Sequence, residues 1–232
     1  MKDERFKIIV TCEHGGNEIP EEYASGFKPA DGVLSSHRGY DIGALELFQK
    51  FKPVADFSLY STTSRLVVEL NRSLHHPQLF SEFMLPLSTA QAEKVLEQHY
   101  YPYRQRAEAK IEDWVQQKFL VVHLSVHTFT PELDGKARKT DIGFLYDPKR
   151  EREQFLAARW RQQMQMKTKH KIRYNYPYKG TADGFVTQLR RNYSNDQYTG
   201  IELEVSQRFP VENGPEWQQL QDTLVATFKL AL

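Results

Sequence analysis

The sequence of 232 residues contains one cysteine, Cys12. A single cysteine excludes an intrachain disulfide and a structural zinc site built from paired CxxC motifs. A chain without disulfides fits a reducing compartment, so we expect a cytoplasmic protein. The sequence also lacks any apolar run near the roughly 20 residues that span a bilayer, and its charged start, MKDERFKIIV, does not resemble a secretory signal. We therefore expect a protein with no membrane partner.

The chain also lacks a strong excess of charge of either sign. It has 31 Lys and Arg residues against 30 Asp and Glu residues, a formal net charge of +1. No global positive field would attract a phosphate backbone, so the charge balance argues against a nucleic-acid partner. Linkers rich in Pro, Gly or Ser and internal repeats are absent, and 40% of the residues are hydrophobic. We therefore expect a single domain over residues 1–232.

Apolar segments of two kinds alternate along the chain. Some are short and rich in β-branched or aromatic residues, which is typical of strands, and others have the spacing of amphipathic helices. This alternation predicts an α/β fold, a single three-layer α/β/α domain with a central mixed, largely parallel sheet. The predicted strands are residues 6–12, 57–60, 65–70, 119–126, 142–146 and 201–205; the predicted helices are residues 41–51, 88–118 with a break or kink at Pro102, 149–167, and a last one that begins at Pro215.

Two histidines follow predicted strands, which in such sheets is the usual place for chemistry. His14 leaves the first strand into a Gly-Gly turn, with the oxygen ligands Glu13, Asn17 and Glu18 close in sequence. His127 follows the nearly continuous apolar run FLVVHLSV, which suits a central strand. These side chains could share a metal ion. A hydrogen-bonded structural role is the commoner one for a single histidine, so both interpretations stay open.

Polar pairs follow two other predicted strands. Asn71 and Arg72 form a donor pair suited to a carboxylate, which a guanidinium can bind through two hydrogen bonds, or they cap a turn. Glu202 and Glu204 share one face of their strand. They form either a solvated strand face or a pair of functional carboxylates.

Two further signals at strand positions admit more than one interpretation. Cys12 has the character of a small buried hydrophobe, with a thiol nucleophile beside His14 as the alternative. His123 and His127 have the spacing of a helical zinc pair, but HLSVH lacks the glutamate of that motif and lies in a strand pattern. We reject the helical metalloprotease hypothesis on that ground.

Six segments in order form a stronger signal than any single residue. CEHGGNEIP, HRGYDIGA, SRLVVELNRS, VHT at 126–128, NYPYKG at 175–180 and IELEV near the end together resemble the N-formylglutamate amidohydrolase family, a branch similar to the zinc carboxypeptidases. The resemblance covers nearly the whole chain. It implies a phosphorylase/hydrolase-like fold, zinc as cofactor, and hydrolysis of the amide bond of a small anionic N-acyl amino acid. The family name indicates N-formylglutamate, cleaved to formate and glutamate.

The resemblance also implies a set of metal ligands. It gives these roles to His14, Asn17 and His127. Asn17 stands where an acidic residue is expected, so either Glu18 is the middle ligand or the metal is held loosely. Asp41 belongs to a matching HxxxD segment for which the residues indicate no role.

Catalytic and substrate-binding roles follow from the same resemblance. Arg65 matches the arginine that polarises the carbonyl, and Glu204 matches the general base, with Glu202 as the alternative. The implied substrate-binding residues are Asn71, Arg72, Tyr178 and Lys179. Two other functions remain open: a metal-dependent amidase or carboxypeptidase for another acyl or peptidyl substrate, and a non-catalytic carboxylate-binding protein that has lost its metal.

Overall fold

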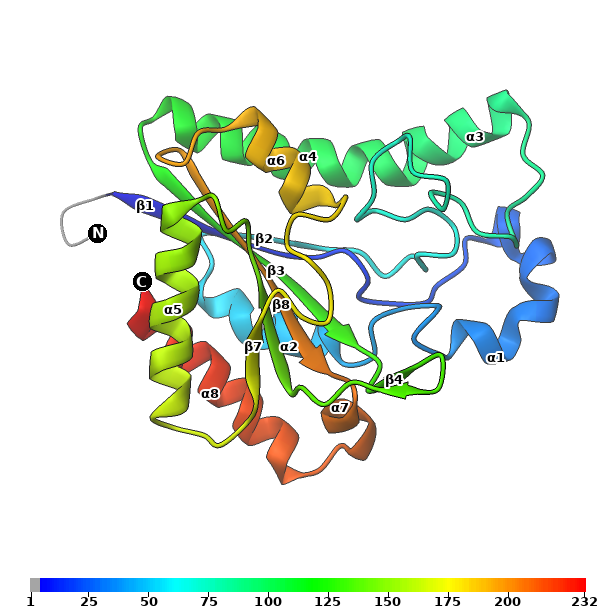
Figure 1. Ribbon diagram of the computed structural model, residues 1–232. Coiled ribbons are helices and arrows are strands. Elements are labelled where there is room, and N and C mark those ends of the chain that lie inside the picture. Colours follow the sequence, from blue (N-terminus) through cyan, green and yellow to red (C-terminus); the bar gives the residue numbers. More distant parts are fainter. Residues whose placement is uncertain (1–4) are drawn as a thin grey trace.

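The structure is a computed structural model that describes residues 5–232. Its centre is a six-stranded sheet (Figure 1). Its strands are β1 (Phe6–Cys12), β2 (Phe57–Tyr60), β3 (Leu120–Phe129), β6 (Ile142–Leu145), β7 (Ile172–Tyr174) and β8 (Tyr198–Ser206). Their order is β2-β1-β3-β8-β6-β7, and neighbouring strands are parallel except for the antiparallel pair β6 and β8. The predicted mixed, largely parallel sheet is confirmed. A separate small hairpin consists of β4 (Glu132–Leu133) and β5 (Lys136–Ala137).

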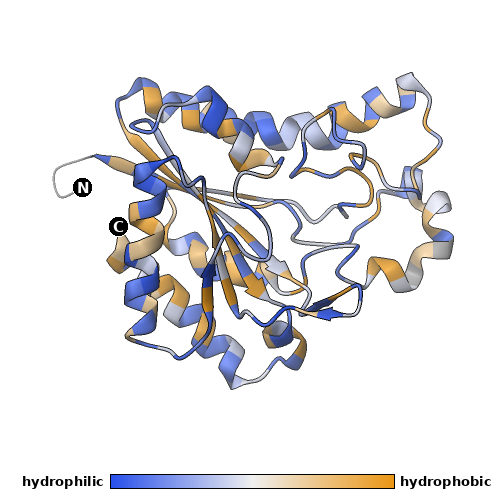
Figure 2. Cartoon of the chain, viewed as in Figure 1, coloured by the Kyte–Doolittle hydropathy of each residue, from blue (hydrophilic) through white to orange (hydrophobic). Residues whose placement is uncertain are grey.

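Helices cover both faces of this sheet, which gives the predicted three layers (Figure 1). On one face lie α2 (Ala44–Phe51), α5 (Glu151–Gln165) and α8 (Pro215–Ala231), whose apolar sides meet one face of the strands in a single hydrophobic cluster. On the other face, α4 (Tyr101–Gln116) and α6 (Phe185–Asn192) pack in a second cluster. Figure 2 shows the hydrophobic residues gathered along the central strands. Burial on both faces explains why all ten residues of β3 are buried, as its continuous apolar run predicts.

The predicted helix 88–118 is present with a widened turn inside it. Ser88 caps α3 (Thr89–Val95) through a capping box with Gln91. A π-helical turn (Leu96–Tyr100) then leads into α4, and Pro102 lies in the first turn of α4. Proline has no N–H to donate and its ring crowds the preceding turn. The irregularity predicted at Pro102 is therefore a π turn just before it, with the helix continuing on both sides.

The predicted strand 65–70 is wrong, because this run forms turns. Its backbone donors are satisfied locally: Leu66 N–H donates to Ser64 Oγ (3.2 Å) and Glu69 N–H to the Leu79 carbonyl (2.9 Å). Its apolar character comes from burial in the second hydrophobic cluster and not from strand pairing. The buried residues of the run are Leu66, Val67, Val68 and Leu70.

Short helical segments complete the fold. They are a 3-10 segment (Glu21–Ala30), α1 (Asp31–Leu34), a second 3-10 turn (Lys52–Val54) and α7 (Arg208–Glu212). Within residues 5–232, none of the helices combines the length and the apolarity that a bilayer crossing requires. The cytoplasmic location stays a prediction.

Candidate active site

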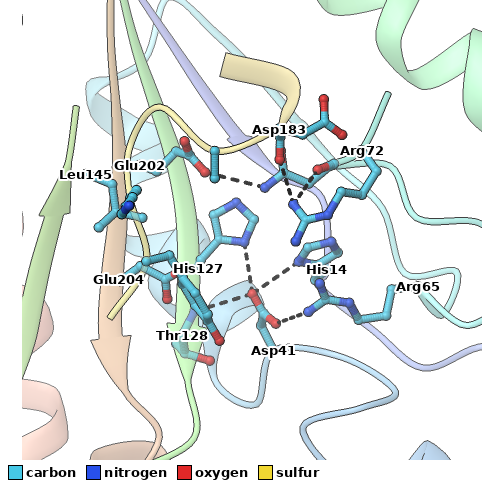
Figure 3. A pocket seen from close by; sticks show the side chains of 14 residues that line it. His14, Asp41, Arg65, Arg72, His127, Thr128, Leu145, Asp183, Glu202 and Glu204 are labelled. Carbon is cyan, nitrogen blue, oxygen red and sulfur yellow. Dashed lines mark hydrogen bonds and ion pairs between the residues drawn. The ribbon is translucent and has the colours of Figure 1, made fainter. Parts of the chain in front are cut away.

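A cavity of about 140 Å³ opens where β1, β3 and β8 end (Figure 3). His14 lies two residues beyond β1, His127 lies on β3, and Glu204 lies on β8 directly opposite His127 in the strand register. Parallel strands bring their carboxyl ends to the same edge of a sheet, which is why these positions meet. With one exception, the site residues predicted from the sequence line this cavity: His14, Arg65, Asn71, Arg72, His127, Tyr178, Lys179 and Glu204.

Two histidines and an aspartate form a compact buried cluster at the base of the cavity. The Asp41 Oδ2 atom lies 2.9 Å from His127 Nδ1 and 3.3 Å from His14 Nδ1 (Figure 3). One ligand atom from each of the three residues lies within 4.8 Å of the other two. Imidazole nitrogens and carboxylate oxygens are ligands that zinc commonly takes in proteins. The cluster therefore has the composition of a divalent metal site.

The exception is Asn17, which the structure places outside this cluster. Its Nδ2 atom donates to the Leu34 carbonyl (3.0 Å). The alternative middle ligand, Glu18, accepts a hydrogen bond from Thr62 Oγ1 (2.6 Å). The residue between the two histidines is Asp41, which belongs to the HxxxD segment that had no assigned role. It occupies the position expected for Asn17 or Glu18. The cluster thus contains a carboxylate at the position where the resemblance implied the amide of Asn17.

Packing of the Gly-Gly turn explains this correction. The backbone after His14 runs directly against the segment after β2, where Gly15 N–H donates to the Ser61 carbonyl (3.0 Å). A Cβ atom on Gly15 would lie 2.8 Å from that oxygen, and one on Gly16 would lie 2.6 Å from the Thr62 carbonyl oxygen. The close approach draws the following residues toward β2 and away from the cavity.

Each histidine ring is also held from its far side by a carboxylate. His14 Nε2 makes a short contact with Glu69 Oε1. His127 Nε2 lies 2.9 Å from Ser125 Oγ and 3.2 Å from Glu13 Oε2. A neutral ring that donates through Nε2 has a lone pair on Nδ1. Two such lone pairs and a carboxylate oxygen then converge on one point, an arrangement of acceptors that requires a cation or additional protons between them.

The electrostatics of the cluster show the same demand for positive charge. Burial by itself would lower the pKa of His127, but hydrogen bonds with Asp41 and Glu13 outweigh it and raise that pKa well above its usual value. Burial would raise the pKa of Asp41, but His14, His127 and Arg65 hold it below the usual range. A proton on His127 Nδ1, which faces Asp41 Oδ2, therefore supplies positive charge at this point of the cluster.

Arg65 bridges two carboxylates of the site. Its Nη1 donates to Asp41 Oδ1 (3.0 Å) and its Nε donates to Glu69 Oε2 (2.8 Å). The guanidinium is partly exposed and also lines the cavity. Its Nη2 also donates to Glu69 Oε2 (2.5 Å). Arg65 thus orients the cluster, and its predicted action on a substrate carbonyl would use the N–H groups of Nη1 and Nη2 that these three hydrogen bonds do not occupy.

Glu204 is a buried carboxyl group without a committed partner. Only 5% of the residue is exposed, and its Oε2 has no hydrogen-bond partner among the residues that the structure describes. Burial raises the pKa of Glu204 to about 8; Asp41 and Glu202 add to the rise, while His127 opposes it. A proton acceptor works best when its pKa lies near the working pH. Glu204 therefore has the character of a general acid or base.

Glu202 differs from Glu204 although both lie on β8. Its Oε2 accepts a hydrogen bond from Asn71 Nδ2 (3.4 Å). Both glutamates are buried, because β8 lies between β3 and β6 and is not an edge strand. The solvated-face interpretation of this pair is wrong, and the uncommitted oxygen favours Glu204 over Glu202 for proton transfer.

Asn71 and Arg72 hold backbone elements at the cavity wall. Asn71 Oδ1 accepts from Phe185 N–H (2.7 Å) at the start of α6. Arg72 Nη1 donates to the carbonyls of Asn71 (3.0 Å) and Asp183 (2.8 Å). Within residues 5–232, no carboxylate makes an ion pair with Arg72, in contrast to Arg65. Among the arginines that line the cavity, Arg72 is therefore the one whose positive charge could pair with a bound anionic ligand.

Tyr178 and Lys179 lie at the exposed mouth of the cavity. Tyr178 is 45% exposed, and its hydroxyl accepts from Arg138 Nη1 (3.2 Å), whose guanidinium carbon lies 5.1 Å from the ring centre. Burial and the nearby Glu204 raise the pKa of Tyr178, while Arg138 opposes the rise, so the phenol stays neutral near pH 7. Both residues lie where they could contact a bound ligand, and their binding roles stay predictions.

The remaining alternatives lie outside the cluster. Cys12 is fully buried, and burial together with Glu13 and Asp41 raises the pKa of its thiol, which disfavours a thiolate nucleophile. His123 lies between Thr11 Oγ1 (2.8 Å) and Tyr198 Oη (2.6 Å), and burial lowers its pKa to about 4. It is a neutral, hydrogen-bonded core histidine.

Comparisons with known proteins agree with this architecture. The family model described as FGase, N-formylglutamate amidohydrolase, matches residues 6–209. The crystal structure of a gene product from Agrobacterium tumefaciens is similar with a TM-score of 0.82 at 24% identity, covering 98% of this chain and 91% of that one. N-formylglutamate amidohydrolase from Ralstonia eutropha JMP134 is similar with a TM-score of 0.71 at 17% identity, covering 99% and 94%. No curated protein matches the chain. At these identities the two structures support the fold alone.

Proposed function

This chain belongs to the N-formylglutamate amidohydrolase family, and from that premise we propose that it is a metal-dependent hydrolase of N-acyl amino acids. N-formylglutamate, cleaved to formate and glutamate, is the substrate that the family description suggests. One observation carries the metal dependence: His14 Nδ1, Asp41 Oδ2 and His127 Nδ1 converge as acceptors beside the uncommitted carboxyl of Glu204.

His14, Asp41 and His127 would hold the cation, with zinc as the proposed metal. The donor set fits, since three acceptors converge and two further carboxylates and Arg65 hold them in place. When bound, such a cation supplies Lewis-acid polarisation of a carbonyl and makes water more acidic.

Glu204 would take a proton from the attacking water and deliver it to the leaving nitrogen of the amide. Without a cation, burial raises the pKa of Glu204 to about 8. A bound cation nearby would lower this pKa toward neutral pH, where the group can both accept and return a proton. In the register of the parallel strands β3 and β8, Glu204 pairs with His127 and so lies next to the cluster.

Arg72 would bind the substrate carboxylate, with Lys179 at the cavity mouth as a second positive charge. Arg65 would add positive charge on the side where an oxyanion develops, a stabilisation of about 2.7–4 kcal/mol if it acts like other oxyanion donors. A cavity of about 140 Å³ favours a small acyl amino acid over an extended peptide. The family match is the reason to prefer an amidohydrolase over a carboxypeptidase.

The test is release of formate or free amine from a panel of N-acyl amino acids. Protein stripped with a chelator is assayed before and after addition of zinc, with N-formylglutamate, N-acetylglutamate and a short peptide as substrates. We expect zinc to restore activity and N-formylglutamate to have the highest kcat/KM. Absence of hydrolysis of every substrate by zinc-supplemented protein would contradict the proposal and favour a carboxylate-binding protein.

A further inference from the structure

We propose that Glu13 is a positioning residue that fixes the tautomer of His127, so that Nδ1 of this ring faces Asp41 as a metal-binding lone pair. The inference rests on the proposed metal dependence. It concerns a residue that is neither in the ligand cluster nor among the residues lining the cavity.

Glu13 is buried, and its carboxylate contacts the Nε2 side of His127, which faces away from Asp41. The residue is 1% exposed. Its Oε1 accepts from the Tyr103 hydroxyl (3.1 Å), and its Oε2 accepts from the Ser125 hydroxyl (2.7 Å). Within residues 5–232, no Lys or Arg makes an ion pair with Glu13, and His127 is its only ion-pair partner. Burial of a carboxylate costs free energy unless the carboxylate is paired. The ion pair with His127 therefore accounts for the burial of Glu13.

Hydrogen-bond accounting around Ser125 assigns the proton on His127. Ser125 has one hydroxyl hydrogen, which it donates to Glu13. Its oxygen also lies 2.9 Å from His127 Nε2, and with its hydrogen already used it can only accept there. Nε2 must therefore carry the hydrogen, which also faces Glu13 Oε2 at 3.2 Å. A charged ring also donates from Nδ1 to Asp41 Oδ2 (2.9 Å), and a cation that takes the place of that Nδ1 proton would meet the lone pair of a neutral ring protonated at Nε2.

His14 has a comparable partner that also serves other groups. Glu69 contacts His14 Nε2 but accepts from Arg65 Nε (2.8 Å) and from Asn71 N–H (2.9 Å) as well. Changing Glu69 would therefore disturb the arginine and the turn together. Glu13 is the cleaner test of a carboxylate acting through a histidine.

The first experiment measures zinc affinity by competition with a chromophoric chelator. Glu13→Gln keeps the size of the side chain but brings an amide donor to the back of His127, and we expect zinc to bind about 10–100-fold more weakly. The matched control is Glu153→Gln: Glu153 is equally buried but pairs with Arg190 (2.9 Å) away from the cavity. The control should lose stability and keep zinc affinity.

Unchanged zinc affinity in Glu13→Gln, with tight binding in the wild type, overturns the inference and leaves the proposed function standing. Wild-type protein that binds no divalent metal overturns the proposed metal dependence and this inference with it. If Glu13→Gln does not fold, Ser125→Ala tests the same chain of hydrogen bonds, with zinc binding expected to weaken on the order of tenfold. Unchanged affinity in Ser125→Ala then overturns the inference.

A second experiment reads the tautomer directly. Long-range ¹H–¹⁵N NMR spectra of the zinc-loaded wild type distinguish a His127 ring protonated at Nε2 from one protonated at Nδ1. We expect protonation at Nε2. Protonation at Nδ1 would show that Glu13 and Ser125 do not hold the ring in the proposed state.

Discussion

Two buried groups of charged and polar side chains differ in how many donors meet their acceptors. One is the pair Glu153 and Arg190, and the other is the cluster of His14, Asp41 and His127. Glu153 accepts from Arg190 Nε (2.9 Å), Gly200 N–H (3.1 Å) and Asp147 N–H (2.8 Å), so both of its oxygens have partners. At the carboxyl ends of the strands, by contrast, the Nδ1 atoms of His14 and His127 converge on Asp41 Oδ2, an atom that also accepts a long hydrogen bond from Thr128 N–H (3.4 Å). The first group is complete as a structural ion pair. The second needs additional positive charge, from protons or from the cation that we propose, which is the property expected of a functional site.

The largest effect that tests this comparison concerns activity. Glu204→Gln removes the proton acceptor and keeps the shape of the side chain, so we expect kcat to fall by about 10²–10⁴. Zinc affinity should change little, because Glu204 is not in the ligand cluster. Rates of hydrolysis and zinc titrations of the purified variant check both statements.

Glu153→Gln should show the opposite behaviour. It breaks a buried pair, for which the expected loss is about 3–5 kcal/mol of unfolding free energy, while kcat/KM of the folded protein stays at the wild-type value. If Glu204→Gln instead lowered stability and kept activity, the contrast between the two regions would fail.

A smaller effect is expected for the wall of the cavity. Arg72→Gln removes a guanidinium that makes no ion pair within residues 5–232 and faces the ligand space. A charge-assisted hydrogen bond contributes about 1.5–3 kcal/mol, so KM should rise about 10–100-fold with kcat nearly unchanged. Arg191→Gln, an exposed arginine on α6, is the matched control. A fall in kcat at constant KM would place Arg72 in the chemical step and not in binding.

The smallest effect concerns pH. Burial raises the pKa of Glu204 from 4.5 to about 8, so the folded metal-free protein retains a proton that the unfolded chain releases in this range. The folded state then binds more protons, and this group lowers the free energy of unfolding as the pH rises from about 4.5 to about 8. We expect Glu204→Gln to gain Tm over the wild type across that window, by at least ~2 °C. Parallel Tm curves for the two metal-free proteins would contradict the assignment.

Sequence patterns correctly predicted the strands whose apolar residues follow one another along the chain. The run FLVVHLSV indicated a central strand, and β3 is buried on both faces. The same reasoning failed for residues 65–70, because a buried turn and a buried strand have similar apolar composition. The position of Asn17 outside the cluster was not visible in the sequence either, because spacing along the chain does not show that the Gly-Gly turn packs against the segment after β2.

By itself, the sequence determined which side chains follow the strands, since strand ends are marked by local composition. That was enough to single out His14 and His127 as candidates, whereas Glu204 was chosen over Glu202 from the family resemblance. Only the tertiary structure decided their partners. Asp41 is 27 positions from His14 and 86 from His127, and Glu13 reaches His127 through Ser125, 112 positions away. The physical reason is that strand order and register set distances between such remote positions, and neither is encoded in any single segment.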